Sequence, residues 1–169
     1  MKITPDVEIE QLLKEAKIAG KLDVLGEGTT RTVYRHPQDK NLVIKKSKRN
    51  NRSNWTEYLI YDAIHENSSL ECLFAKVSCI SESGKYLIME CLKNAGGKGI
   101  GACPNWYTDR KPDNFGEDSN GAVKILDYGS IKLDCLSNTA IVQPPSSGER
   151  QEMENYSNII DKISNFSSL

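Results

Sequence analysis

The sequence predicts an α+β fold of two lobes, with a five-stranded antiparallel sheet and one crossing helix in the first lobe and a strongly reduced second lobe. Three observations support this prediction. Several short segments before residue 92 are rich in apolar and β-branched residues, as strands are. Residues 54–64 instead space their apolar residues like one face of a helix. Between residues 93 and 106, four glycines and a proline exclude a long helix.

The length and the charge of the chain limit its organisation and its partners. A chain of 169 residues is one domain, which we treat as residues 1–169 with lobes at about 1–92 and 93–169. The net charge is −1, so no overall field attracts nucleic acid or an anionic membrane. We therefore expect a monomer that binds neither nucleic acid nor a membrane.

The apolar runs and the cysteines point to a cytoplasmic protein. No apolar run approaches the roughly eighteen residues of a membrane span, and the N-terminus lacks the pattern of a Sec-type signal peptide. The five cysteines are odd in number and form no C-x-x-C pair, and the chain has only two histidines. We expect reduced thiols rather than a disulfide framework or a zinc site.

The elements of the first lobe follow from local signals. An amphipathic helix is expected between Pro5 and Gly20, which supply its start and its stop, and its apolar stripe is expected to pack on the sheet. The strands are expected at residues 22–25, around Val33, and at 42–45, 72–80 and 86–90. The helix at 54–64 crosses between the third and fourth strands.

A turn with two glycines joins the first two strands. Gly26 and Gly28 allow a tight turn and a close approach of the backbone to a phosphate group. The order strand, turn, strand differs from a Walker loop or a dinucleotide-binding turn, both of which lead into a helix. The pattern indicates a phosphate-binding hairpin, although an ordinary hairpin with two glycines has the same sequence.

Four polar side chains fall on two successive turns further along the chain. Asp109 and Asn114 are five residues apart, and Asp127 follows Asn114 by thirteen. Together with Lys111 they provide a base, a cation and oxygen ligands for Mg²⁺, which are the groups that phosphoryl transfer requires. The alternative is an ordinary solvent-exposed turn followed by a strand and a second turn. Either turn by itself would be explained equally well in that way.

These stretches resemble the protein kinase family. Asp109-Arg-Lys-Pro-Asp-Asn114 resembles the catalytic-loop pattern D-x-K-P-x-N, and Asp127-Tyr-Gly129 resembles D-F-G with tyrosine for phenylalanine. The glycine turn is similar to G-x-G-x-x-G-x-V, with Arg31 in place of the third glycine, which bears on the flexibility of the loop. Leu42–Lys45 resembles the V-A-I-K strand. The resemblance implies a protein-kinase-like two-lobed fold that binds ATP and Mg²⁺.

The resemblance also implies a role for each site residue. Lys45 would contact the α- and β-phosphates and pair with Glu57 of the crossing helix, with Glu66 as the fallback partner. Asp109 would orient and deprotonate the acceptor hydroxyl, and Lys111 would steady the γ-phosphate. The remaining roles are Mg²⁺ ligation by Asn114 and Asp127, and nucleotide binding by Leu25, Gly26, Gly28, Val33, Lys45, the gatekeeper Met89, and the backbone of Glu90 and Leu92.

Several features depart from ordinary protein kinases. Only sixteen residues separate Leu92 from Asp109, and only forty-two follow Asp127. Tyr107 and Thr108 stand where the family has histidine and arginine, which predicts activity without activation-loop phosphorylation. No A-P-E element follows Asp127. We expect short extended segments at 131–133 and 140–142 and a final helix at about 153–163.

The first interpretation is a minimal Ser/Thr protein kinase. In its small size and missing elements it is similar to small kinases that bacteria inject into host cells by non-Sec routes. This similarity implies a host regulator, such as a chaperone or a ubiquitin-pathway protein, as substrate. A phage-encoded kinase fits equally well. Two alternatives stay open: a small-molecule phosphotransferase of the aminoglycoside type, and a pseudokinase that serves as a binding or inhibitor module.

Overall fold

The computed structural model describes residues 2–48, 52–66, 68–98, 107 and 109–130. Its elements are, in chain order, β1 (Lys2–Thr4), α1 (Asp6–Ile18), β2 (Val24–Glu27), β3 (Arg31–Arg35), β4 (Leu42–Ser47), α2 (Ser53–Ile64), α3 (Ser68–Glu71), β5 (Val77–Ser81), β6 (Tyr86–Glu90), β7 (Lys93–Asn94), the 3₁₀ helix η1 (Pro112–Asn114), β8 (Phe115–Glu117) and β9 (Val123–Ile125). The α+β class is confirmed. The segments predicted at 131–133, 140–142 and 153–163 lie outside the described residues.

The main sheet is mixed and has six strands in the order β1-β5-β6-β4-β3-β2. The prediction of a five-stranded antiparallel sheet is therefore wrong in both number and type. The additional strand is β1, which runs parallel to β5 and pairs Ile3 with Ile80, whereas the other neighbours are antiparallel. Three residues are too few to show the alternation of side chains along a strand. In addition, the pairing partner of β1 is β5, which lies about seventy-five residues further along the chain.

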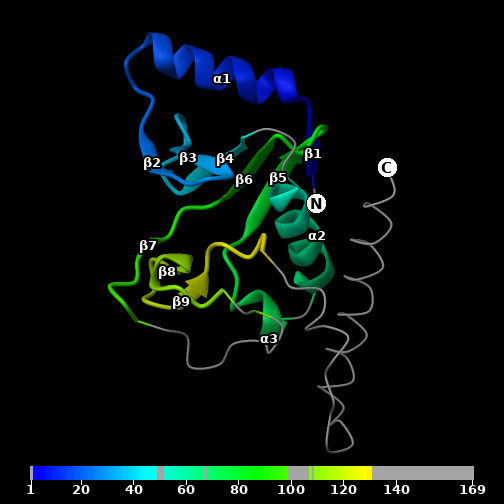
Figure 1. Ribbon diagram of the computed structural model, residues 1–169, viewed down its shortest axis with the longest axis vertical. Coiled ribbons are helices and arrows are strands. Elements are labelled where there is room, and N and C mark those ends of the chain that lie inside the picture. The colour runs from blue at the N-terminus through cyan, green and yellow to red at the C-terminus, as the bar shows by residue number, and fades with distance from the viewer. Residues whose placement is uncertain (1, 49–51, 67, 99–106, 108, 131–169) are drawn as a thin grey trace, which may run out of the picture.

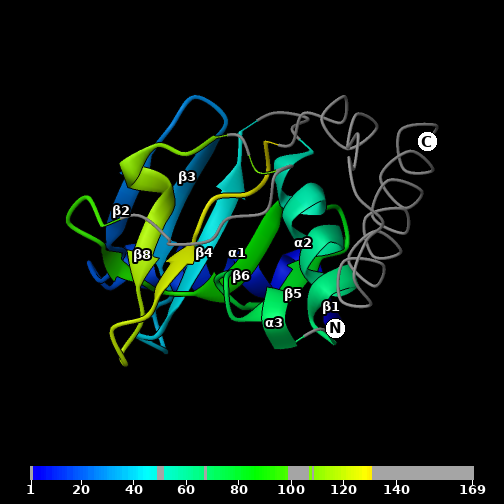
Figure 2. The same ribbon diagram turned by 90° about the horizontal axis from the view of Figure 1, so that it is seen from below.

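Helices cover both faces of this sheet rather than one (Figures 1 and 2). From one face, α1 packs Ile9 and Leu13 against a cluster that includes Ile44 and Ile88 of the sheet. Its outer face is exposed, as the position of Ile18 illustrates (79% exposed). The predicted amphipathic helix is thus present, and its buried stripe lies against the sheet as expected.

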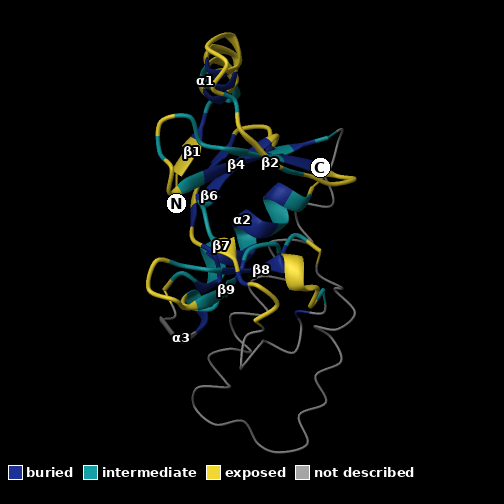
Figure 3. Cartoon of the chain, turned by 90° about the vertical axis from the view of Figure 1, so that its left-hand side faces the viewer, coloured by how far each residue is buried: buried dark blue, intermediate teal, exposed yellow. Residues whose placement is uncertain are grey.

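The larger core lies on the opposite face, beneath α2. Ile60 and Ile64 of α2 are fully buried there against Leu87 and Met89 of β6. Figure 3 shows the buried residues gathered in β4, β6 and α2, between the exposed side of α1 and the outer loops. Because side chains alternate along a strand, β6 can supply both cores, with Ile88 on the α1 side and its neighbours on the α2 side.

A second, three-stranded sheet has the order β7-β8-β9 and lies on the side of the main sheet away from α1 (Figure 1). It is attached to the segment after α3 by a parallel bridge between Phe74 and Ile125, where Ala75 N–H donates to Ile125 O over 2.8 Å. The predicted strand at 72–80 is consequently shorter and begins at Val77. None of the helices in the described part of the chain is long and apolar enough to span a membrane.

Candidate active site

A cavity of about 590 Å³ lies between the glycine hairpin, the sheet and the two polar turns, and its size is typical of a ligand pocket. Its lining includes every residue that the sequence predicts for nucleotide binding and both predicted metal ligands. These are Leu25, Gly26, Gly28, Val33, Lys45, Met89, Glu90 and Leu92, together with Asn114 and Asp127. The structure thus brings together residues from six separate segments of the chain.

Lys45 is buried on β4 and forms an ion pair with Glu57 of α2. Its Nζ lies 3.0 Å from each carboxylate oxygen of Glu57 and donates to Leu126 O over 2.6 Å. Glu57 is completely buried, whereas Glu66, the fallback candidate, is exposed beyond the end of α2. Burial lowers the pKa of Lys45 below its ordinary value, although the Glu57 carboxylate acts in the opposite direction. The expected pairing of Lys45 with Glu57 is present.

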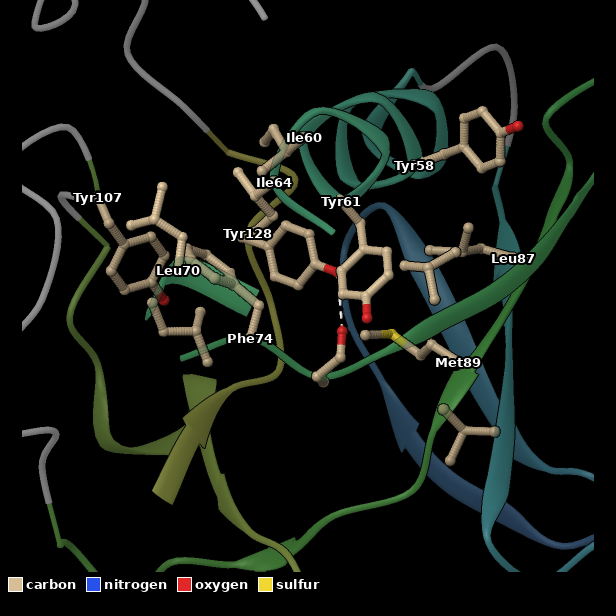
Figure 4. Close-up of a cluster of buried hydrophobic side chains, with 14 of the residues drawn as sticks. Tyr58, Ile60, Tyr61, Ile64, Leu70, Phe74, Leu87, Met89, Tyr107 and Tyr128 are labelled. Atoms are coloured by element: carbon tan, nitrogen blue, oxygen red, sulfur yellow. Dashed lines mark hydrogen bonds between the residues drawn. The ribbon is translucent and has the colours of Figure 1, made fainter. Parts of the chain in front are cut away.

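Glu57 also holds the turn that contains Asp127. Its Oε1 accepts hydrogen bonds from Tyr128 N–H at 3.0 Å and Gly129 N–H at 3.2 Å. Tyr128 is buried with its ring edge-on to Phe74, the centroids being 5.1 Å apart, and its hydroxyl donates to Ala75 O (Figure 4). The buried Tyr128 hydroxyl is therefore accommodated because it has a buried acceptor.

Hydrogen bonds join the two polar turns to one another. Leu126 N–H donates to Asn114 O over 2.8 Å, and the buried Tyr107 donates from its hydroxyl to Asp127 O over 3.0 Å. Asn114 in turn donates from Nδ2 to Asp109 O over 2.8 Å. These contacts fix the relative positions of Asp109, Asn114 and Asp127 without any ligand.

Asp109 and Lys111 lie beside the cavity and are not among its lining residues. Lys111 Nζ is 3.1 Å from Asp109 Oδ1, and the Lys111 side chain is 73% exposed. Both side chains are accessible from solvent, and their ion pair is of the weak, exposed kind. Asp109 is connected to the cavity through Asn114.

Oxygen atoms of the type that ligates Mg²⁺ are available on Asn114 and Asp127, which both line the cavity. Asn114 uses Nδ2 in the bond to Asp109, and no donor among the described residues bonds to its Oδ1. Asp127 accepts a hydrogen bond at Oδ1, and none of the N–H or O–H groups in the described ranges donates to its Oδ2. Mg²⁺ is commonly held by one or two such side chains together with substrate phosphates and water. The described residues contain no group of three or more His, Cys, Asp or Glu that could hold a metal without such a substrate.

The far end of the cavity is apolar and has a free backbone donor. Leu25 is 41% exposed at the hairpin, and Met89 is buried at the back. Cys91 N–H donates to Asn41 O, whereas no hydrogen bond within the described residues engages Leu92 N–H. The Glu90 carboxylate is paired with Lys124, whose Nζ lies 3.0–3.1 Å from its two oxygens.

Arg31 is a charged residue of the cavity that the sequence interpretation did not include among the site residues. It was expected only to affect the flexibility of the hairpin, but it is 6% exposed and contacts Glu57 and Asp127. Burial alone would raise the pKa of Asp127, but Lys45 and Arg31 lower it to about 2. Arg31 and Val33 are two residues apart on β3 and thus face the same side of the sheet, a signal that could have revealed the contact.

Comparison with known proteins adds no assignment. A scan against protein families finds no family that matches this chain, and a search of curated proteins finds no match. The functional argument therefore depends on the residues themselves.

Proposed function

We propose that this protein has a protein-kinase-like two-lobed fold and is an ATP- and Mg²⁺-dependent kinase of minimal type that phosphorylates serine or threonine in a protein. The observation that supports this most directly is the single cavity in which Lys45, Asn114 and Asp127 meet beneath a two-glycine hairpin. An ammonium, an amide oxygen and a carboxylate at the walls of one ligand-sized cavity are the groups that bind a nucleoside triphosphate with its metal.

The first task of the chain in this proposal is to position the nucleotide. Leu25 and Val33 provide an apolar surface for the base, and Leu92 N–H provides a donor for its edge. Lys45, fixed by Glu57, directs its positive charge at the α- and β-phosphates. Asn114 and Asp127 would hold Mg²⁺, which neutralises charge on the phosphates when bound.

The second task is to direct the acceptor. The oxygen of the acceptor hydroxyl bonds to the γ-phosphorus while the bond from that phosphorus to the β,γ-bridging oxygen breaks, and ADP leaves. Asp109 orients the hydroxyl and accepts its proton, and Lys111 steadies the transferred group. Asp109 is suited to this because Asn114 fixes its backbone while its carboxylate stays accessible, with 30% of the side chain exposed. The proposed substrate is a protein, such as a host chaperone or ubiquitin-pathway protein reached after non-Sec delivery.

A second candidate function is nucleotide binding without transfer, as in a pseudokinase module. One observation favours it: Arg31 lies 2.6 Å from Asp127 Oδ1, and its positive charge reduces the attraction of this carboxylate for a metal ion at the other oxygen. Binding of ATP without any phosphoryl transfer would support this alternative.

The test is incubation of the purified protein with radiolabelled ATP, Mg²⁺ and a bacterial or host-cell lysate. We expect a labelled protein band with the wild type, none with Asp127→Asn or Asp109→Asn, and wild-type labelling with the exposed-site control Glu66→Gln. Asp109→Asn should still be stabilised thermally by ATP, since it lies outside the cavity lining. Label in a small metabolite instead would indicate a small-molecule phosphotransferase, and activity retained by Asp127→Asn would refute its metal role.

A further inference from the structure

Arg31 occupies an unusual position at the base of the glycine hairpin. It is the first residue of β3, and its backbone oxygen accepts a hydrogen bond from Gly28 N–H at 2.9 Å, which closes the hairpin. Its side chain is 7% exposed and lines the cavity. A guanidinium group is thus held beneath the segment that would cover the phosphates.

The guanidinium group bridges two carboxylates of the site. One terminal nitrogen lies 2.8 Å from Glu57 Oε2, and the other lies 2.6 Å from Asp127 Oδ1. The first nitrogen also donates to Asn54 Oδ1 over 3.4 Å. With Lys45 on Glu57, this cluster of four side chains contains two positive and two negative charges and is neutral by itself.

We propose that Arg31 is a built-in counter-ion that competes with the metal for Asp127 and makes metal binding depend on the nucleotide. In the free protein it satisfies Asp127 and weakens the attraction for a divalent cation. When phosphates enter the cavity, their negative charge attracts the guanidinium group and releases Asp127 to the metal. Arg31 is in this sense a positioning residue for the proposed kinase, and the inference rests on the proposed function.

The two halves of this idea predict opposite effects of one substitution. Arg31→Gln removes a positive charge that lies 2.6 Å from Asp127, so the free protein should bind Mn²⁺, used in place of Mg²⁺, about tenfold more tightly. The same variant should bind metal-free ATP, measured in EDTA, about tenfold more weakly, because one of the two cations near the phosphates is lost. General damage to the site would weaken both affinities, so the opposite signs distinguish the mechanism from a structural defect.

A second variant guards against misfolding. Arg31→Gln leaves the cluster of Lys45, Glu57 and Asp127 with one negative charge in excess, and the double variant Arg31→Gln/Glu57→Gln removes that excess. The double variant has the net charge of the wild-type cluster but lacks the Arg31–Asp127 contact, so both shifts should keep their signs and be smaller. The control is Arg35→Gln, four residues further along β3, where the guanidinium group pairs with Asp23 at the surface. The control should change neither affinity.

The experiment is Mn²⁺ binding by electron paramagnetic resonance and ATP binding in EDTA by calorimetry, on the full chain. Opposite shifts in the Arg31 variants support the proposal. If the wild type binds ATP with Mg²⁺ but the variants bind Mn²⁺ no more tightly, the role of Arg31 is wrong and the kinase proposal stands. If the wild type binds neither ATP nor Mn²⁺ under any of these conditions, both proposals fail.

Discussion

Replacing Glu57 by glutamine should destabilise the protein strongly, because this carboxylate neutralises two buried cations. Lys45 Nζ lies 3.0 Å and Arg31 2.8 Å from its oxygens, and Glu57 itself is fully buried. Glutamine keeps the shape and loses the charge, so Lys45 and Arg31 are left with Asp127 as their only carboxylate neighbour in the cluster. Breaking a buried ion pair by removing one partner costs about 3–5 kcal/mol.

The loss should be visible in equilibrium unfolding. With a urea m-value of about 2 kcal/mol/M, a loss of about 4 kcal/mol moves the midpoint down by about 2 M without changing m. Trp55 of α2 packs edge-on against Tyr58 and provides a fluorescence signal for the transition. The matched control is Glu66→Gln, whose side chain is exposed, with an expected change below about 0.5 kcal/mol.

A double substitution tests the physical reason for this loss. Lys45→Met alone leaves the cluster of Lys45, Arg31, Glu57 and Asp127 with one negative charge in excess, and Glu57→Gln alone leaves it with one positive charge in excess. In the double variant the charges again balance, between Arg31 and Asp127, and the loss should be clearly smaller than the sum of the two single losses. Strict additivity, or a loss below about 1 kcal/mol in Glu57→Gln, would contradict the argument from buried charge.

Two further predictions concern the packing of the first lobe. Partial burial alone would raise the pKa of Asp6, but hydrogen bonds from Ser83 at 2.6 and 3.0 Å lower the pKa below its ordinary value. Asp6→Asn should therefore cost about 0.5–1 kcal/mol at pH 7, and progressively less in urea titrations as the pH falls and the carboxylate is protonated. Gly84→Ala should cost about 2–3 kcal/mol in thermal unfolding, because φ is +73° and the added Cβ would lie 2.0 Å from the Trp55 ring. Gly20→Ala, at φ +66° with open space around it, should cost only about 1 kcal/mol, and equal losses at the two glycines would refute the steric part.

The sequence by itself determined most of the individual elements and the set of candidate site residues. The crossing helix, the hairpin at Gly26–Gly28 and the strand ending at Glu90 depend on periodicity and turn chemistry within a few residues, and all three are present near the predicted bounds. The spacing of Asp109, Asn114 and Asp127 is likewise a local property of two turns. These features can be predicted from the sequence because they depend only on residues that are close together in the chain.

Only the tertiary structure decided how these elements meet. β1 joins the sheet as a parallel strand through backbone pairing that leaves no pattern in three residues. Arg31 contacts Asp127, which is 96 positions away in the chain. The sequence suggested only a change in loop flexibility at Arg31, whereas the structure has a buried ion pair there. Tyr128 is tolerated because Ala75 O happens to lie within 2.9 Å of its hydroxyl. Each depends on where distant backbone atoms come to rest, and that position is set by the packing of the whole core rather than by local residue preference.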